Sequence, residues 1–126
     1  MAKYVDGFVL IVPKDKTEEY KRMASEGRDM WMKYGALEYY ECIGDDLTQN
    51  QMGEEKTRAF GEMAGAKDDE NVWFSFIVFS SKEHRDEVNK KVMEEMSEKY
   101  KEHQDMSMPV DMKRMAYGGF RTEVEG

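Results

Sequence analysis

The chain has 126 residues, with 19 basic and 27 acidic side chains, a net charge of −8 and 40% hydrophobic residues. This length predicts one domain over residues 1–126, and the hydrophobic fraction is sufficient for a packed core. The acidic composition argues against a nucleic-acid binder, because such proteins neutralise phosphates with cations. No apolar run approaches the roughly 18 residues of a membrane span, so neither nucleic acid nor membrane is expected as a partner.

The compartment follows from two further features. The first residues lack the apolar segment of a signal peptide. Cys42 is the single cysteine, which excludes a disulfide within the chain and favours a reducing environment. We therefore expect a cytoplasmic protein, with Cys42 as a small buried side chain.

The N-terminal part predicts a strand followed by a helix. Residues 4–12 (YVDGFVLIV) have the β-branched and aromatic residues of a strand, which Pro13 ends. Asp15 and Glu18 are spaced as a capping box for a helix over residues 17–34. That helix carries an apolar stripe at i, i+3, i+4, i+7 spacing, formed by Tyr20, Met23, Ala24, Gly27, Trp31 and Tyr34.

A second strand and a long acidic loop come next. Gly35 is a suitable C-cap, and residues 36–43 (ALEYYECI) form the second predicted strand. Residues 44–70 hold eight acids against three bases, so this loop alone carries −5 of the net charge of −8. Within the loop a short helix is predicted near residues 54–63.

The C-terminal part repeats the strand and helix order. Residues 71–79 (NVWFSFIVF) give the strongest strand pattern of the chain. Ser80 and Glu83 are spaced as a capping box for a second long helix. After a loop over residues 103–113, residues 115–122 (MAYGGFRT) form the last predicted strand. The apolar stripe of the second helix is formed by Val88, Val92, Met96 and Tyr100.

The order of these elements predicts an α+β fold. It is that of the ferredoxin-like βαββαβ plait, which has a four-stranded antiparallel sheet. Two helices can cover only one face of such a sheet, yet the strands at residues 4–12 and 71–79 are apolar on both faces. The simplest cover for the second face is the same face of another copy, so we expect a homodimer with its sheets facing each other.

Six blocks of residues carry a family resemblance across residues 3–122. They are residues 4–8 (YVDGF), 35–39 (GALEY), 41–42 (EC), 45–46 (DD), 81–86 (SKEHRD) and 113–120 (KRMAYGGF). Together they resemble the YbaA-like family of small bacterial proteins, a domain of unknown function. The resemblance implies membership of the dimeric α/β-barrel superfamily, in which two ferredoxin-like subunits face their sheets together. It also implies cofactor-free oxygenation or isomerisation as a possible activity.

An enzyme of that kind would handle protons with a few side chains of this chain. Asp6 interrupts an otherwise apolar strand face, so it must be paired or carry a raised pKa if it is buried. A general base in a cavity and a salt bridge to Arg121 or Arg114 are equally open for it. The candidate catalytic residues are Asp6, Glu41, His84 and Tyr117.

His84, Arg85 and Asp86 fall in the first turn of the second long helix. Near a helix N-terminus they could form an acid/base or anion-binding trio. The alternative, which we favour, is a capping and salt-bridge cluster that anchors the helix.

Other residues could shape a binding pocket. Trp31 and Trp73, which could wall an aromatic pocket, are most simply core residues, whereas Arg85 and Asp86 could contact a polar ligand. The Gly118–Gly119 pair predicts a β-bulge in the last strand. The methionines of the last loop, with Met106 and Met108 among them, are predicted to serve as adaptable packing rather than as Cu(I) ligands near His103.

We therefore expect a homodimer that binds a small, partly aromatic molecule in a cavity between sheet and helices, with no metal and no cofactor. The alternatives are a cofactor-free monooxygenase-like or isomerase-like enzyme and a non-catalytic stress-response module. A pocket lined by Trp31, Trp73 and at least two of the four polar candidates would favour the enzyme.

Overall fold

The computed structural model describes residues 2–48, 51–102 and 109–126, and for residues 51, 52 and 100–102 it describes the backbone only. Its main sheet has four antiparallel strands in the order β2-β5-β1-β6. The chain is therefore α+β with an open four-stranded antiparallel sheet, as predicted. The strands of this sheet are β1 (Tyr4–Pro13), β2 (Glu38–Ile43), β5 (Glu70–Phe79) and β6 (Ala116–Arg121).

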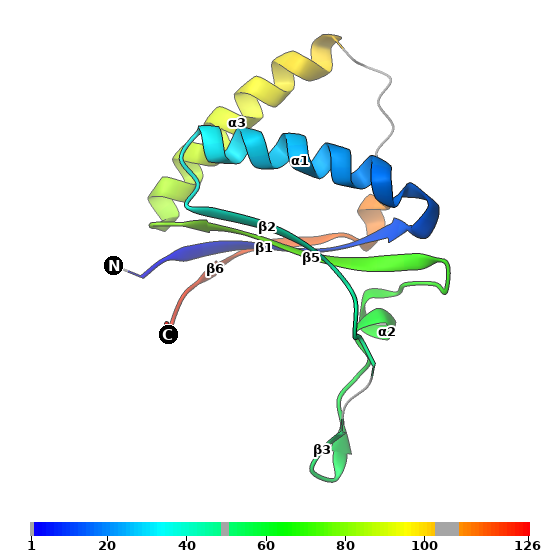
Figure 1. Cartoon of the computed structure of the whole chain (residues 1–126). Coiled ribbons are helices and arrows are strands. Elements are labelled where there is room, and N and C mark those ends of the chain that lie inside the picture. Colours follow the sequence, from blue (N-terminus) through cyan, green and yellow to red (C-terminus); the bar gives the residue numbers. More distant parts are fainter. Residues whose placement is uncertain (1, 49–50, 103–108) are drawn as a thin grey trace.

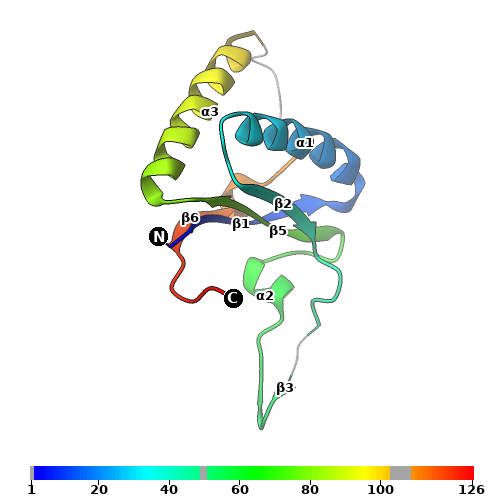
Figure 2. The same cartoon turned by 60° about the vertical axis from the view of Figure 1, so that its left-hand side comes forward.

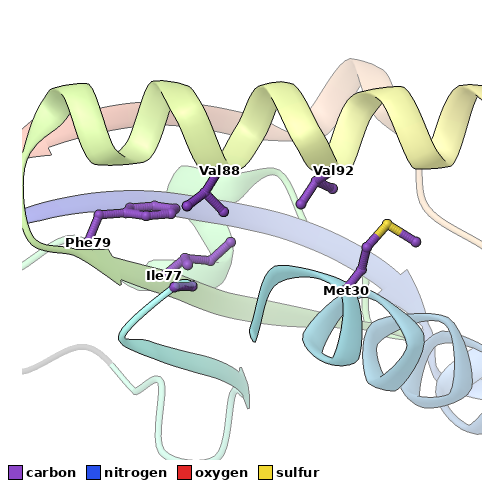
Figure 3. Packing of buried hydrophobic residues seen from close by; sticks show 6 residues of the cluster. Met30, Ile77, Phe79, Val88 and Val92 are labelled. Carbon is purple, nitrogen blue, oxygen red and sulfur yellow. The ribbon is translucent and has the colours of Figure 1, made fainter. Parts of the chain in front are cut away.

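Both long helices lie on the same face of this sheet (Figure 1). They are α1 (Thr17–Lys33) and α3 (Lys82–Glu102). Three members of the predicted stripe of α3 pack toward the sheet, since Val88 and Val92 are buried in one cluster with Phe79 at the C-terminal end of β5, and Met96 packs against this cluster. The side chain of Tyr100 lies outside the described residues. Figure 3 shows Val88 beside Phe79, which is itself fully buried, and Val92 further along α3, nearer Met30.

The N-terminal part of the α1 stripe packs against the other end of the sheet, whereas Trp31 and Tyr34 pack against the cluster of Val88 and Val92. Tyr20 and Ala24 are buried there against Leu10 and Val12 of β1 and Trp73 of β5. The two groups of buried residues form one layer between the helices and the sheet, because both helices pack against the central strands β1 and β5. Apolar periodicity alone therefore predicted which side of each helix is buried.

The opposite face of the sheet is largely open. The short helix α2 (Phe60–Ala64) lies under one end of it, where its first residue lines a shallow pocket with Cys42 and Phe74 (Figure 2). Beyond α2, large apolar side chains are exposed, with Phe74 46% and Phe120 62% accessible. The prediction of a sheet that is apolar on both faces is confirmed. The prediction of a buried Cys42 is wrong, because this cysteine lies on the open face and is exposed.

The acidic loop contains elements that the sequence pattern did not reveal. Strands β3 (Gln51–Met52) and β4 (Glu55–Lys56) form a small hairpin that projects away from the main sheet (Figure 1). Gly53, with φ of +68°, lies at its turn. The predicted helix near residues 54–63 is shorter and begins later, as α2, because the hairpin occupies the first of those residues.

Both predicted capping boxes are wrong in detail. A 3₁₀ helix, η1 (Lys14–Lys16), precedes α1 and takes up Asp15, so no side chain caps α1. Helix α3 begins one residue later than predicted, and Ser81 rather than Ser80 caps it. The Ser81 hydroxyl accepts a hydrogen bond from the backbone N–H of His84 at 3.1 Å.

Arg114 connects the acidic loop to the first residue of β5. It belongs to the 3₁₀ helix η2 (Met112–Arg114), and its guanidinium donates to both carboxylate oxygens of Glu70 at 2.7 and 2.6 Å. The same guanidinium donates to Asp111 at 2.8 Å and to the carbonyl of Gly65 at 2.8 Å. The hydrogen bonds from Arg114 hold the pKa of Glu70 at about 2, below its ordinary value of 4.5.

This pair predicts a pH-dependent contribution to stability. Because the folded-state pKa of Glu70 is depressed, its contribution is complete above about pH 4.5 and is lost as the pH falls toward 2. Glu70→Gln should therefore lose less stability than the wild type over that interval, measured as the thermal midpoint against pH. Glu123→Gln is the control, because it removes an exposed pair with Arg121 and should keep the wild-type profile. Parallel pH profiles for the wild type and Glu70→Gln would contradict the prediction.

Candidate functional site

A cavity of about 160 Å³ lies between α1 and the sheet. A dry apolar cavity of about 150 Å³ is large enough to bind benzene, so this one has room for a molecule with a single aromatic ring. Its walls are mostly apolar and aromatic, formed in large part by Phe8, Leu10, Met23, Trp31, Ile77 and Met96.

Among the described residues, Glu41 is the charged side chain in the wall of this cavity. It lies on the helix-facing side of β2, directly opposite Ser75 of β5. Its carboxylate accepts hydrogen bonds from Tyr20 at 2.8 Å, from Tyr39 at 2.6 Å and from the Ser75 hydroxyl. Burial, followed by the nearby Glu41 charge, raises the pKa of both tyrosines. Both phenols therefore stay protonated and act as donors at neutral pH.

A second polar cluster surrounds Asp6, which is 1% exposed. Its carboxylate lies 3.1 Å from the Arg85 Nε atom. It also accepts hydrogen bonds from the Asn89 amide and the Tyr117 hydroxyl, each at 3.2 Å. Burial and the Asp6 charge raise the pKa of Tyr117. Asp6 is thus paired with a cation inside the fold.

The arginine that pairs with Asp6 is not one of the two predicted from the sequence. Arg121 bonds to Glu123, and Arg114 bonds to Glu70, so neither is available to Asp6. The first turn of α3 instead brings Arg85 over β1. Strand periodicity could not reveal this pair, because it depends on how α3 crosses the sheet.

Gly119 provides the space for this arginine. The pairing of β1 with β6 runs regularly through Asp6 and Gly119, so the predicted bulge is absent. A Cβ atom at Gly119 would overlap Arg85 Nη2 and the Tyr4 hydroxyl. The guanidinium carbon of Arg85 lies 4.8 Å from the centre of the Tyr4 ring, and Arg85 Nη2 donates to the Tyr4 hydroxyl at 3.0 Å. Glycine at this position therefore permits the packing of the ion pair.

Asn89 connects the Asp6 cluster to the cavity. Its amide group donates to Asp6, and its carbonyl oxygen accepts a hydrogen bond from the indole N–H of Trp31 at 2.9 Å. Trp31 is part of the cavity wall. The ring of Tyr117 also stacks on Phe8, another wall residue, with 4.7 Å between ring centres. The Asp6 cluster thus fixes two aromatic rings of the cavity.

His84 belongs to neither cluster. Its Nδ1 atom accepts a hydrogen bond from the backbone N–H of Ser80 at 3.0 Å, and its ring meets Phe79 edge to face. Asp86 is exposed and bonds to Arg85 at 2.9 Å. These contacts anchor the start of α3, which is the alternative that we favoured for the trio.

The predicted site residues are therefore divided between places. Glu41 and Trp31 line the cavity. Asp6, Arg85 and Tyr117 lie in the neighbouring cluster. Trp73 lines a separate groove, which Glu41 also borders. His103, Met106 and Met108 lie outside the described residues. The residues that sequence reasoning missed are Tyr20, Tyr39, Ser75 and Asn89. Ser75 had a recognisable signal, because it is the single polar residue within an apolar strand run.

Comparison with known proteins identifies the family. Residues 3–112 match the family model described as "Protein of unknown function (DUF1428)". The chain is 40% identical over 123 residues to the uncharacterized protein YbaA of Escherichia coli (strain K12), and equally to that of Shigella flexneri. Each match covers 98% of this chain and 98% of the relative. No helix within the described residues is long and apolar enough to cross a membrane. The chain belongs to the DUF1428 family, alongside the YbaA proteins, as its sequence blocks predicted.

Proposed function

We propose that the protein is a homodimeric binding protein that holds one small, partly aromatic molecule in the cavity between α1 and the sheet. The cavity itself carries this proposal, because it combines apolar walls with a volume of about 160 Å³ and, within the part of the chain that the structure describes, one charged wall residue, Glu41. Catalysis is less well supported. Of the four polar candidates only Glu41 lines the cavity within the described residues, and Trp73 is absent from its wall.

The homodimer rests on the open face of the sheet. With β1 and β5 at the centre and both helices on one side, the strand order supports a ferredoxin-like plait. On the open side, residues 5–11 of β1 and 72–78 of β5 present only apolar side chains and glycine. A surface without charge at its centre is complementary to itself, so a second copy fits it best. Two sheets packed in this way would form a dimeric α/β barrel.

The compartment remains part of the proposal. Cys42 is a free and exposed thiol. A single cysteine without an intrachain partner suits a reducing environment, so we place the protein in the cytoplasm.

Binding of fluorobenzene, followed by ¹⁹F NMR, tests the cavity. The wild type should bind it with a dissociation constant of about 1 mM or lower, which is about −4 kcal/mol or stronger. At tenfold excess over that constant, the ligand should stabilise the folded chain by about 1.4 kcal/mol. Ala24→Leu should abolish binding, because Ala24 is buried in the cavity wall and the longer side chain would fill the space.

Ala64→Leu is the matched control, because it makes the same change in α2, outside the cavity wall. It should bind fluorobenzene as the wild type does. The thermal midpoint of Ala24→Leu verifies that this variant is folded. Unchanged binding in folded Ala24→Leu, or no binding by the wild type, would contradict the proposal.

A further inference from the structure

The carboxylate of Glu41 constrains the chemistry of the ligand. Building on the binding function proposed above, we propose that the ligand carries a protonated amine on its aromatic or apolar body, with Glu41 as the counter-ion of that amine.

The carboxylate of Glu41 can accept one hydrogen bond more than the described residues donate to it. A carboxylate has about four acceptor positions on its two oxygens. Within the described residues, Oε1 accepts from Tyr20 and from Ser75, whereas Oε2 accepts from Tyr39 alone. One acceptor position on Oε2 is therefore left for a donor from a ligand.

The carboxylate of Glu41 lacks a cationic partner within the described residues. All three donors to its carboxylate are neutral hydroxyls, and no ion pair within the described residues includes it. Two cations of α1, Lys21 and Arg28, line the adjacent groove. Both are paired with other residues of α1, Lys21 with Glu18 at 3.6 Å and Arg28 with Asp29 at 2.9 Å. A carboxylate in an apolar wall is stabilised by a counter-charge, which a cationic ligand would supply.

Aromatic rings surround Glu41 in the cavity wall. The rings of Tyr20, Tyr39 and Trp31 all contribute to the wall that contains Glu41. Aromatic faces attract cations, and more strongly where water is excluded. An amine held at Glu41 would therefore be favoured by the rings as well as by the carboxylate. A ligand carboxylate would instead meet the negative charge of Glu41, and the cations near it in the described part of the chain are already paired.

Three probes of similar size test this proposal: benzylamine, benzyl alcohol and benzoate. The wild type should bind benzylamine at least about tenfold more tightly than benzyl alcohol, which corresponds to one close charge-assisted contact, and benzoate most weakly. Glu41→Gln keeps the shape of the side chain and removes its charge. It should lose the preference for benzylamine while its affinity for benzyl alcohol changes less than about threefold.

A pH series on the wild type provides a second measurement that does not depend on the folding of a variant. As the pH rises through the pKa of the amine, its affinity should fall to that of benzyl alcohol. Tyr20 and Tyr39 stay neutral through this change, since the pKa of each is raised. Benzyl alcohol, measured at each pH, is the control, because it carries no titrating group.

The outcomes separate the two proposals. If benzyl alcohol binds in the cavity but benzylamine binds no more tightly, or benzoate binds best, the assignment of an amine ligand is overturned and the binding function stands. If fluorobenzene binds but none of the three probes does, the assignment of an amine ligand is overturned and the binding function stands. If neither fluorobenzene nor any of the three probes binds to the wild type, both are overturned. A benzylamine preference that persists in folded Glu41→Gln would also overturn the role of Glu41.

Discussion

Arg85→Ala is expected to lower the free energy of unfolding by about 3–5 kcal/mol, the cost of removing one partner from a buried ion pair. Asp6 is 1% exposed, and Arg85 is the cation beside its carboxylate, at 3.1 Å. Asn89 and Tyr117 would still donate to Asp6, but neither carries a charge. The variant would therefore leave an uncompensated negative charge inside the fold. Urea unfolding, followed by tryptophan fluorescence, measures the change.

Two further variants show whether the loss comes from the ion pair. Replacing both partners, as Asp6→Leu with Arg85→Met, should be far less destabilising than Arg85→Ala alone, because no buried charge is left unpaired. Arg121→Ala is the exposed control, since its pair with Glu123 is solvated and should contribute at most about 1 kcal/mol. A loss below about 1 kcal/mol in Arg85→Ala would contradict the burial of a true ion pair.

The elements of the sheet layer could be predicted from local patterns. The run of β-branched and aromatic residues at positions 4–12 and the helical stripe through Tyr20, Ala24 and Trp31 depend on neighbours in the sequence, and the structure has both. Helix starts were less predictable. Ser80 and Ser81 are adjacent hydroxyl residues, and only the backbone geometry decides which one caps α3.

The polar clusters could be predicted only in part, because their members are distant in sequence. Strand alternation placed Asp6 and Glu41 on definite faces of the sheet. Their partners come from other elements, with 83 positions between Asn89 and Asp6 and 34 between Ser75 and Glu41. Such pairings depend on the crossing of α3 and on the register of β2 against β5, neither of which a local pattern records.

For the open face of the sheet, the sequence predicts a cover that the single subunit does not contain. The continuous apolar run of residues 71–79 predicted that a second apolar face would need a cover, and the single subunit leaves that face exposed around Phe74 and Phe120. The exposed thiol of Cys42 has the same origin. The need for a cover could thus be predicted from the sequence, whereas the proposed cover lies outside the single subunit.

Phe120→Glu is expected to convert the proposed homodimer into monomers. Phe120 lies on β6 on the open side of the sheet and is 62% exposed in the subunit, so its replacement should change the fold of that subunit little. In a dimer with two-fold symmetry the substitution enters the interface twice, and each copy would bury a carboxylate against apolar side chains. An ionised group buried without a partner costs several kcal/mol, and two of them would oppose association.

Light scattering at micromolar concentration measures this change as a mass. The wild type should have twice the subunit mass of 14.8 kDa, and Phe120→Glu should have the subunit mass. Val124→Glu is the control, because Val124 is 92% exposed in the C-terminal segment and should leave the dimer intact. The thermal midpoint of the wild type should also rise with protein concentration, whereas that of Phe120→Glu should not. A wild type of subunit mass, or a dimeric Phe120→Glu, would mean that the open sheet face is not where two copies meet.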